Sequence, residues 1–361
     1  MKSRTMRLRT KLLAVIAILI IIIFGTTATL TALRVKQNSE VMAVDYMQAI
    51  SKEYSYEAKS IMNQALLVAK TASPLLEVVI ARGAGQKRLT IIDSLEHLLR
   101  TNPNFFGIWI ISEPDAVGSD ADFRGDRANG SDSLGIFSPY LYRKGQEIVV
   151  DATEASQDYL ETYYSTPKVT GKALVSDPYL DTVEGEDVYM ITAAAPVMLD
   201  DVFIGVVGVD IKASTVFELL AGRTIYETGF VRLMSSDGTV VVHSDKDRIG
   251  KIAPEWTDEK EKDRIQEVIS GKIVTMRSYS LATKTDMMKT FVPIYFGTGV
   301  KPWVAGTVVS IEEMYAASAS IVTGSLIIMI IGAAIILVGV FVAITVMRSE
   351  EHTSELQSRI T

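Results

Sequence analysis

The sequence predicts an α+β fold in which a long N-terminal helix carries two antiparallel sheet modules between two transmembrane helices. Residues 12–33 and 321–347 contain no ionisable side chain. At about 1.5 Å per residue, a helix of either length crosses a hydrocarbon core of roughly 30 Å. Residues 34–80 are nearly free of glycine, and apolar side chains recur there at steps of three and four residues, which is typical of a helix. Two similar stretches, FIGVVGVDI and WVAGTVVSI, each follow a proline and indicate that one sheet module occurs twice.

The charge distribution predicts a chain that crosses the inner membrane twice and holds its middle part outside the cytoplasm. The first apolar run is preceded by no acid and by the basic residues Lys2, Arg4, Arg7, Arg9 and Lys11. The positive-inside rule therefore places residues 1–11 in the cytoplasm. A cleaved signal peptide is the competing interpretation. The apolar run exceeds the roughly 7 to 15 residues of such a segment, however, and no clean cleavage site follows it.

The composition argues against several classes of protein. Cysteine is absent, so disulfide bonds and thiolate metal sites are impossible, and neither a metal nor a cofactor is expected. The net charge of −7 argues against nucleic acid as a partner, because nucleic-acid-binding domains are usually basic. Ser235, Ser236, Asp237 and His243 have hydrolase-like side chains, but no nucleophile-elbow pattern surrounds them. The chain is therefore not expected to be an enzyme.

The first predicted elements are mainly helical. Pro74 should kink or break the long helix over 34–80, and a loop at 81–86 leads to a second helix over 89–99. A short strand follows at 105–111, bounded by prolines and an asparagine. The next segment, GSDADFRGDRANGSDS, lacks the ligand order of an EF-hand and is expected to be a solvated loop.

The later elements predict the two sheets. Strands of one antiparallel sheet are expected at 136–142, 173–175, 188–194 and 203–211, followed by a helix over 214–221. The dipeptide Asp237-Gly238 indicates a hairpin that begins a second, smaller sheet. The predicted domains are a membrane-distal module at 81–222, a membrane-proximal module at 223–318 and the second transmembrane helix at 319–347.

The stretch from Asp158 to Asp210 concentrates aromatic rings, carboxylates and turn residues. The candidate ligand-binding residues are Tyr159, Glu161, Tyr163, Tyr164, Tyr179, Asp181 and Asp210, together with Trp109 and Tyr140 from the strands before them. Aromatic faces and carboxylates suit a small ligand that carries a positive group. Superposing the two similar stretches puts Ser310 at the position of Asp210, so the ligand is expected in the distal module.

Four local pieces in this order carry a family resemblance: NPNFFGIWIISEP, GIFSPYLYRKG, YYSTPKVTGKALVSDPYLD and FIGVVGVDI. Over residues 34–318 the chain resembles the double Cache sensor region of bacterial transmembrane receptors, particularly methyl-accepting chemotaxis proteins. The resemblance implies two PAS-like modules, a small-molecule ligand in the distal one, and signalling through the helices to a cytoplasmic output. It also implies a homodimer formed through the long first helix.

The resemblance also suggests roles for single residues. In the amino-acid-binding members an Arg, two aromatic residues, a Tyr and an Asp line the pocket. By motif, Tyr163 and Tyr164 match the aromatic pair, Tyr179 matches the Tyr and Asp210 the Asp, while Glu161 stands where the family has Arg. This reversal of charge favours an amine or a quaternary ammonium ligand. Three alternatives stay open: an amino acid bound in a modified manner, another ligand or none, and a Glu161 that points to water.

The end of the chain carries two further expectations. Residues 348–361, RSEEHTSELQSRIT, resemble the translation of a short-read sequencing adapter, and they are expected to be an artefact that cuts the reading frame after the second transmembrane helix. His352 then has no functional weight, and cytoplasmic signalling partners would act only through the missing output domain. That output belongs to a chemoreceptor or, in the second hypothesis, to a histidine kinase or a diguanylate cyclase. An exported enzyme is the third and weakest hypothesis.

Overall fold

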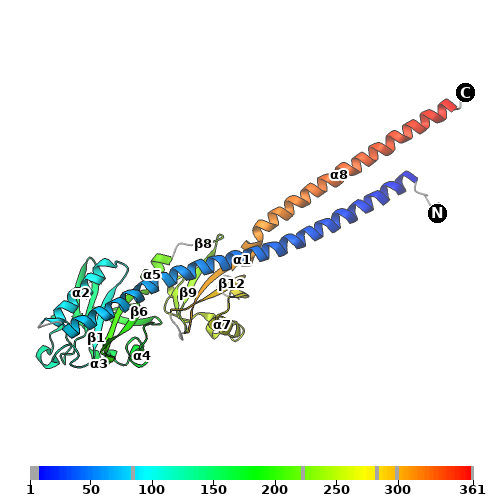
Figure 1. The fold of residues 1–361 in the computed structure, drawn as a ribbon. Coiled ribbons are helices and arrows are strands. Elements are labelled where there is room, and N and C mark those ends of the chain that lie inside the picture. Colours follow the sequence, from blue (N-terminus) through cyan, green and yellow to red (C-terminus); the bar gives the residue numbers. More distant parts are fainter. Residues whose placement is uncertain (1–7, 83–85, 221–223, 281–283, 297–300, 359–361) are drawn as a thin grey trace. The chain divides into compact units, whose positions relative to one another are not determined.

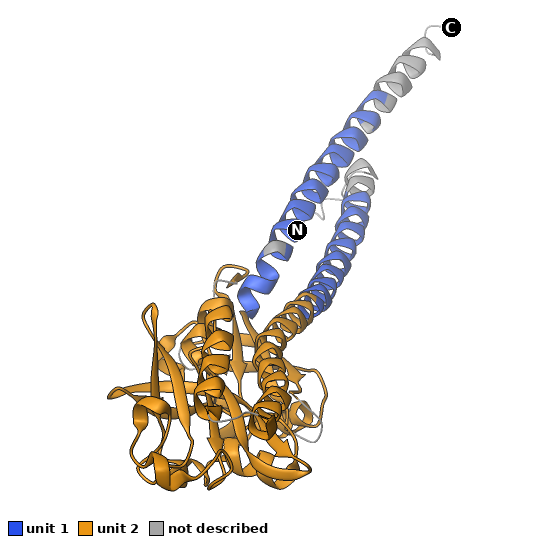
Figure 2. Ribbon diagram, turned by 60° about the vertical axis from the view of Figure 1, so that its left-hand side comes forward, with its two compact units in different colours: residues 1–45, 310–361 blue, residues 46–309 orange. Residues whose placement is uncertain are grey.

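The computed structural model describes residues 8–82, 86–220, 224–280, 284–296 and 301–358 (Figure 1). The basic residues Lys2, Arg4 and Arg7 and residues 83–85 of the predicted loop lie outside the described residues. The chain divides into two compact units. Residues 46–309 form the globular unit, and residues 1–45 with 310–361 form the other (Figure 2).

A single helix, α1 (Leu8–Arg82), opens the described chain and is 75 residues long. Pro74 lies inside it, so the helix is not broken there, and the predicted kink stays a prediction. Proline removes the hydrogen bond to the carbonyl four residues earlier, and both Pro74 and Lys70 are exposed, where water can replace that bond. Leu76 and Ile80 beyond the proline are buried. Their burial stabilises the last turns of the helix.

One face of α1 is buried within the globular unit. Its side chains recur every three or four residues, and they are Met47, Ser51, Tyr54, Ala58, Met62, Ala65, Ala69, Ala72 and Leu76. Polar contacts reach both sheet modules from this face. Ser51 Oγ lies 2.9 Å from Thr307 Oγ1 of the second module, and Ser73 donates to the carbonyl of Pro196 in the first at 2.8 Å. The helix therefore supports both modules (Figure 1).

The first module (residues 87–220) is built on a seven-stranded antiparallel sheet in the order β3-β2-β1-β7-β6-β4, with β5 paired to β6. Its elements are α2 (Lys87–Thr101), β1 (Gly107–Ser112), η1 (Asp120–Phe123), η2 (Arg127–Asn129), β2 (Pro139–Lys144), β3 (Glu147–Ala152), α3 (Ala155–Asp158), α4 (Thr162–Thr170), β4 (Leu174–Val175), β5 (Tyr179–Val183), β6 (Glu186–Leu199), β7 (Val202–Lys212) and α5 (Ala213–Leu220). All the strands predicted here are present, and β3 and β5 are additions. Strand β3 is mostly half-buried and β5 is mostly exposed, so both lack the apolar pattern that identified the others.

The second module (residues 224–309) has a six-stranded antiparallel sheet in the order β10-β9-β13-β12-β11, with β8 paired to β9. Its elements are β8 (Thr224–Ile225), β9 (Gly229–Met234), β10 (Val240–Val242), η3 (Lys246–Arg248), α6 (Pro254–Thr257), α7 (Lys262–Ile269), β11 (Val274–Ser280), β12 (Thr285–Ile294) and β13 (Trp303–Ser310). The predicted hairpin is formed by β9 and β10. At its turn Gly238 has a φ of 92°, and a Cβ there would lie 2.4 Å from the ring of Trp256.

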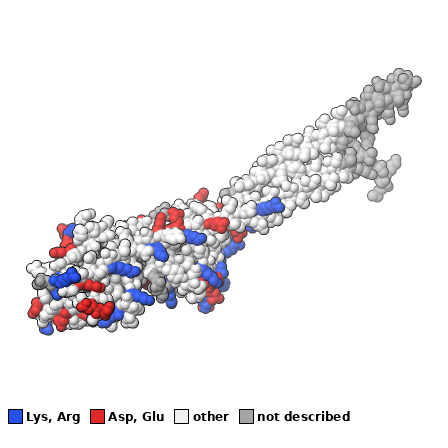
Figure 3. All heavy atoms as spheres, viewed as in Figure 1, with Lys and Arg blue, Asp and Glu red and all other residues white. Residues whose placement is uncertain are grey.

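The second unit contains the two apolar stretches. Both α1 and α8 (Ile311–Ser358) contain windows long and apolar enough to cross a membrane, and these windows are 6% and 0% buried. Within this unit the Tyr315 hydroxyl donates to Glu40 Oε2 at 2.8 Å. Figure 3 shows charged side chains of both signs over the globular unit and an uncharged length on each helix. The helices thus have the composition of membrane spans, while the cytoplasmic N-terminus stays a prediction.

The predicted fold class is confirmed. A long N-terminal helix is followed by two antiparallel sheet modules, and an apolar helix lies at each end of the described chain. The predicted boundaries of the domains and of the artefact tail stay predictions, although α8 continues as helix through residue 358.

Candidate functional site

The first module contains a cavity of about 350 Å³. Strands β1, β2 and β7 line it, together with residues between 151 and 184. Five aromatic rings face it, from Trp109, Tyr140, Tyr142, Tyr163 and Tyr179. Five carboxylates also line it, those of Asp151, Asp158, Asp181, Glu184 and Asp210. Among the described lining residues the only side chain with a fixed positive charge is Arg127.

The strand register brings the deepest groups together. Trp109 on β1 pairs with Tyr140 on β2 and, on its other side, with Gly208 on β7. A Cβ at position 208 would lie 2.1 Å from the indole ring. Because glycine has none, the ring can lie across β7, where its Nε1 donates to both carboxylate oxygens of Asp210 at 3.1 Å. Gly208 is therefore a part of the site that the sequence did not reveal.

Asp210 is an acid without a counter-charge at the bottom of this arrangement. It is 1% exposed and accepts a hydrogen bond from Thr192 Oγ1 at 2.6 Å as well as those from Trp109. Since Thr192 gives its proton to Asp210, the hydroxyl of Tyr179, 2.7 Å away, donates to Thr192. Burial raises the pKa of Asp210 to about 6, and the hydrogen bonds from Thr192 and Trp109 oppose this shift. Only neutral side chains bond this carboxylate within the described residues.

Asp158 is a second acid of the cavity, and it was not among the predicted site residues. Its Oδ1 accepts from the Tyr163 hydroxyl at 2.7 Å, while its Oδ2 is buried and makes no regular hydrogen bond within the described part of the chain. Burial raises the pKa of Asp158, and the neighbouring hydroxyls of Thr153 and Tyr163 oppose the rise. The ring of Tyr163 lies 5.4 Å from that of Trp109 and 5.4 Å from that of Tyr179. Asp158 thus places a carboxylate beside the aromatic wall.

Arg127 is already engaged with acids. Its Nε donates to Asp151 Oδ1 at 2.8 Å, and its Nη1 lies 3.2 Å from Glu154 Oε1. The hydrogen bond to Asp151 raises the pKa of Arg127. A carboxylate ligand would have to compete with these two acids for the guanidinium. The cavity as a whole is therefore negative and suited to a cation.

The structure brings six of the nine predicted site residues to this cavity: Trp109, Tyr140, Tyr163, Tyr179, Asp181 and Asp210. Asp181 is exposed and lies on β5, whereas Asp210 is buried. Their role in binding a ligand stays a prediction.

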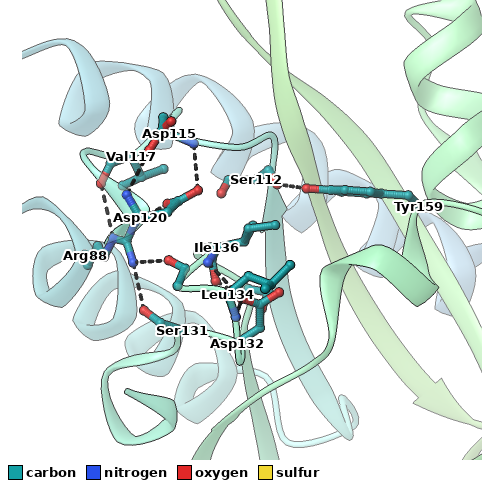
Figure 4. Close-up of polar contacts among 12 residues, drawn as sticks. Arg88, Ser112, Asp115, Val117, Asp120, Ser131, Asp132, Leu134, Ile136 and Tyr159 are labelled. Carbon is teal, nitrogen blue, oxygen red and sulfur yellow. Dashed lines mark hydrogen bonds and ion pairs between the residues drawn. The ribbon is translucent and has the colours of Figure 1, made fainter. Parts of the chain in front are cut away.

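The other three predicted residues are not part of the lining. Tyr159 donates its hydroxyl to the carbonyl of Ser112 at 2.6 Å, as Figure 4 shows. Tyr164 donates to Glu113 Oε1 at 2.6 Å. Glu161 is exposed at the N-cap of α4, so it points to water, as one of the alternatives supposed.

The reason lies in the local secondary structure. Tyr163 and Tyr164 are neighbours on α4 and not on a strand or loop. Successive side chains on a helix point about 100° apart, so one ring faces the cavity while the other packs against Tyr159, with ring centres 4.8 Å apart. The family's aromatic pair could not be resolved into one site residue and one packing residue without knowing that this segment is a helix.

The polar loop between β1 and β2 is more ordered than predicted, and the expectation of a solvated loop is wrong in part. Arg88 of α2 is 4% exposed and donates to Asp120 at 2.6 Å, to Ser131 at 2.8 Å and to two backbone carbonyls (Figure 4). Asp132 is 1% exposed and accepts two backbone N–H groups of the turn that follows it. A buried acid needs such partners, and Arg88 lies too far away in the sequence for the pattern to suggest it.

The two modules have matching strand positions. On β7, Gly208 faces Trp109 of β1, and on β13, Gly306 faces Arg232 of β9. A Cβ at 208 would lie 2.1 Å from the Trp109 ring, whereas a Cβ at 306 would lie 3.0 Å from the Phe291 ring and 3.4 Å from Arg232 Cγ. Arg232 of the second module therefore occupies the position that Trp109 has in the first.

This match corrects one detail of the sequence comparison. Two residues after the paired glycines come Asp210 and Val308, each three residues before the next helix begins. Val308 is therefore the counterpart of Asp210, and the superposition on Ser310 is wrong. The sequence comparison aligned the two nine-residue stretches end to end, but Asp210 lies two residues before the end of β7 at Lys212, whereas Ser310 is the last residue of β13.

Comparison with protein families identifies the first module. Residues 91–218 match the family model described as methyl-accepting chemotaxis protein-like, first PDC sensor domain. This segment is a PDC (Cache) sensor domain. The resemblance stated from the sequence motifs is thereby confirmed for the segment that holds the cavity.

Individual proteins extend the likeness beyond the sensor domain. Over 251 residues the chain is 29% identical to the methyl-accepting chemotaxis protein TlpQ of Pseudomonas aeruginosa. This alignment covers 63% of this chain and 34% of TlpQ. The chain thus spans about a third of that relative's length. A structure described as the extracellular domain of a histidine kinase, mmHK1S-Z3, shares 26% identity at a TM-score of 0.68, over 77% of this chain and 98% of that one. A structure of methyl-accepting chemotaxis protein X gives a TM-score of 0.64 at 22% identity, and the match covers 77% of this chain and 99% of that one. The two-module architecture is therefore that of known receptor sensor regions.

Proposed function

We propose that this chain is the extracytoplasmic sensing part of a transmembrane chemoreceptor and that its first, membrane-distal module binds a small cationic ligand, an amine or a quaternary ammonium. The buried carboxylate of Asp210, which has no counter-charge among the described residues, carries this proposal. A buried charge without a partner is unfavourable, and a bound cation supplies the missing partner.

The aromatic wall adds to this argument. Tyr163 lies between Trp109 and Tyr179, so ring faces and edges surround the space in front of Asp210. Each ring face contributes roughly 0.5 to 2 kcal/mol to a nearby cation. A charge-assisted hydrogen bond contributes roughly 1.5 to 3 kcal/mol. Several such contributions, less the entropy of binding, correspond to an affinity near micromolar, about −8 kcal/mol.

An amino acid is the second candidate ligand, and one observation favours it. Arg127 lines the same cavity, and its side chain is 47% exposed, so a ligand carboxylate could reach it. Such a ligand would place its ammonium at Asp210 and displace Asp151 from the guanidinium. A neutral or acidic ligand has no comparable partner for Asp210.

A pair of isosteric probes tests the charge requirement. Choline and 3,3-dimethyl-1-butanol have nearly the same shape, but only choline carries a charge. Thermal unfolding of the full chain in detergent should shift upward with choline and stay unchanged with the neutral alcohol. An equal shift with both compounds would show that shape and not charge is recognised. Glycine tests the second candidate, because it should stabilise the wild type through both Asp210 and Arg127. Replacing Arg127 should then abolish the shift with glycine and leave the shift with choline unchanged.

The receptor class rests on the likeness to chemotaxis proteins and on the two apolar helices. A chemoreceptor of this kind crosses the inner membrane twice and acts as a homodimer. The likeness to the extracellular domain of a histidine kinase favours a second output, because the same sensor fold serves both classes. The coding sequence beyond the second apolar helix distinguishes them: heptad repeats indicate a chemoreceptor, and a catalytic domain indicates a kinase or a diguanylate cyclase.

We infer that the signal leaves the cavity through the segment 176–179. Tyr179 at its end lines the cavity and bonds Thr192, which bonds Asp210. Ser176 at its start exchanges hydrogen bonds with the backbone of Thr192 at 2.8 and 3.0 Å. Both ends of the segment are therefore tied to the residue that holds the buried acid.

The middle of this segment forms hydrogen bonds with the second module. Asp177 accepts from the backbone N–H of Ser236 at 3.0 Å and from its hydroxyl at 2.7 Å. Ser236 belongs to the turn of the β9–β10 hairpin, so a shift of the segment is transmitted to the second sheet. A ligand favours one arrangement only as far as it binds that arrangement more tightly. Binding at Asp210 acts on this equilibrium through Thr192.

A further inference from the structure

The second module has a cavity of its own, of about 330 Å³, close in size to that of the first module. Apolar and aromatic side chains, among them Phe230 and Met287, form part of its wall. Charged groups lie at the same wall, and Arg232 there occupies the position of Trp109 in the first module. The space is thus comparable, but its chemistry differs.

The inner acids of this cavity are already paired. Arg232 donates through Nη1 and Nη2 to the two oxygens of Glu255, at 3.1 and 2.6 Å. Lys289 donates to Glu255 at 2.7 Å and to Glu261 at 3.1 Å. Ser278 donates to Glu261 as well. The two cations and the two acids balance, so no inner carboxylate remains to attract a cation.

A donor remains instead. His243 is 5% exposed, and its Nδ1 accepts from the backbone N–H of Asp245 at 2.9 Å. The ring proton of the neutral imidazole is therefore on Nε2, which has no hydrogen-bond partner among the described residues. Burial, with the nearby charges of Arg232 and Arg248, lowers the pKa of His243 to about 4, so the ring is neutral at pH 7. The ring of Phe230, with its centre 4.7 Å away, packs against this imidazole.

A loosely held cation accompanies this donor. Arg248 lines the cavity, its side chain is 39% exposed, and its Nε lies 3.5 Å from Asp245. That separation is long for a charge-assisted hydrogen bond, so the guanidinium can turn to a better acceptor. The Nε–H of Arg232 is also buried without a hydrogen-bond partner in the described part of the chain. Two further carboxylates of the lining, Asp245 and Asp258, are exposed to solvent, so the buried groups that lack a hydrogen-bond partner are donors.

We propose that the cavity of the second module binds a small monocarboxylate, whose oxygens accept from His243 Nε2 and Arg248 while its short carbon chain lies against Phe230 and Met287. The first module would then take a cation and the second an anion. This site is independent of the ligand proposed for the first module, because no lining residue is shared.

Titration of the full chain in detergent with sodium propionate, by calorimetry at constant ionic strength, tests the site. We expect binding to the wild type that weakens at least about tenfold in His243→Phe, which keeps a ring but removes the donor. His243→Gln retains an N–H and should stay within about threefold of the wild type. Asp210→Asn, in the first module, should bind propionate as the wild type does.

Arg248→Met is a second variant, and because the side chain is half exposed, the protein should fold normally. It should also bind propionate about tenfold more weakly. The proposal is overturned if the wild type does not bind propionate, or if His243→Phe and Arg248→Met both bind it as the wild type does. Loss of binding in Asp210→Asn would overturn it too, by placing the propionate in the first module.

Discussion

In the first module the buried acid Asp210 accepts hydrogen bonds from neutral donors alone, whereas in the second module Glu255 lies between Arg232 and Lys289. Both carboxylates are almost fully buried, at 1% and 2% exposure. Burial raises the pKa of Asp210 to about 6. Burial also favours a higher pKa for Glu255, but the charges of Arg232 and Lys289 outweigh it and hold that pKa well below its usual range.

This difference shows that the same strand order can hold a buried acid without a counter-charge in one module and a buried acid with counter-charges in the other. The second module carries its own cations at the acid, so its ion pairs are complete without a ligand. The first module has a ring, Trp109, where the second has Arg232, and its acid is left for a partner from outside. The residue that faces a glycine on the neighbouring strand, Trp109 or Arg232, thus distinguishes the module with the unpaired acid from the module with the paired one.

The largest expected effect is at Glu255. Glu255→Gln leaves Arg232 and Lys289 buried without their shared acid, and breaking a buried ion pair costs about 3 to 5 kcal/mol. The free energy of unfolding of the full chain, measured with denaturant, should fall by that amount. Glu259→Gln is the matched control, because its side chain is 81% exposed and should change stability by less than about 0.5 kcal/mol.

Asp210→Asn should, in contrast, increase the free energy of unfolding when no ligand is bound. The folded pKa of Asp210 lies above its unfolded value of 3.8, so the folded protein binds more protons and loses stability as the pH rises from about 4 to about 6. At pH 7 this costs roughly 3 kcal/mol, which an uncharged side chain avoids. Denaturant unfolding should show a more stable variant at pH 7 and no advantage near pH 4. The exposed Asp122→Asn is the control and should show neither effect. A less stable Asp210→Asn protein at pH 7 would contradict the absence of a counter-charge.

The paired glycines give a smaller contrast. A Cβ at 208 would lie 2.1 Å from the Trp109 ring, so Gly208→Ala should displace this ring and destabilise the protein by about 1 to 3 kcal/mol. At 306 the nearest atom, on the Phe291 ring, is 3.0 Å away, and Gly306→Ala should cost about 1 kcal/mol or less. Quenching of Trp109 fluorescence by choline should be lost in Gly208→Ala alone. Equal destabilisation by the two substitutions would contradict the closer packing at Gly208.

The smallest effect is expected at the link between the modules. Asp177→Asn and Ser236→Ala each remove part of one contact, so in a double-mutant cycle their effects should be non-additive by about 1 kcal/mol. Because the chain has no cysteine, spin labels can be attached through cysteines introduced at the exposed positions Asp122 and Lys260. The ligand should shift the distance between labels in the wild type and not in the double variant, although both bind the ligand. An unchanged shift in the double variant would contradict the proposed route.

The fold was largely predictable because its signals are periodic. The uncharged runs, the three-and-four spacing along α1 and the apolar strands of both sheets identify the elements. Strand β3 is mostly half-buried and β5 is mostly exposed, so neither has such a pattern and neither could be predicted. The continuation of α1 through Pro74 could not be predicted, because the penalty for proline in a helix depends on which side of the helix faces water.

The site was predictable in composition but not in detail. Asp210 and the rings of Trp109 and Tyr163 lie together because strand pairing and one helix turn bring them there. Glu161 attracted attention as a reversed charge, yet it is exposed and lies away from the cavity. The position of Asp158 in the cavity and the pairing of Gly208 with Trp109 depend on contacts between segments that are distant in the sequence. No local sequence pattern predicts such contacts. The proposal of a cationic ligand therefore rests on Asp210 and Asp158 and not on the substitution at Glu161.

The central claim is that an ionised Asp210 binds a cation in the first module, and the pH dependence of choline affinity tests it most directly. The charge of choline does not change with pH, so any pH dependence belongs to the protein. Since the pKa of Asp210 is about 6, calorimetry should show binding about tenfold weaker at pH 5 than at pH 7.5 in the wild type. In Asp210→Asn the affinity should be at least about a hundredfold lower at pH 7.5 and nearly independent of pH. Wild-type binding that is equally strong at both pH values, or an Asp210→Asn protein that keeps the wild-type profile, would contradict the claim.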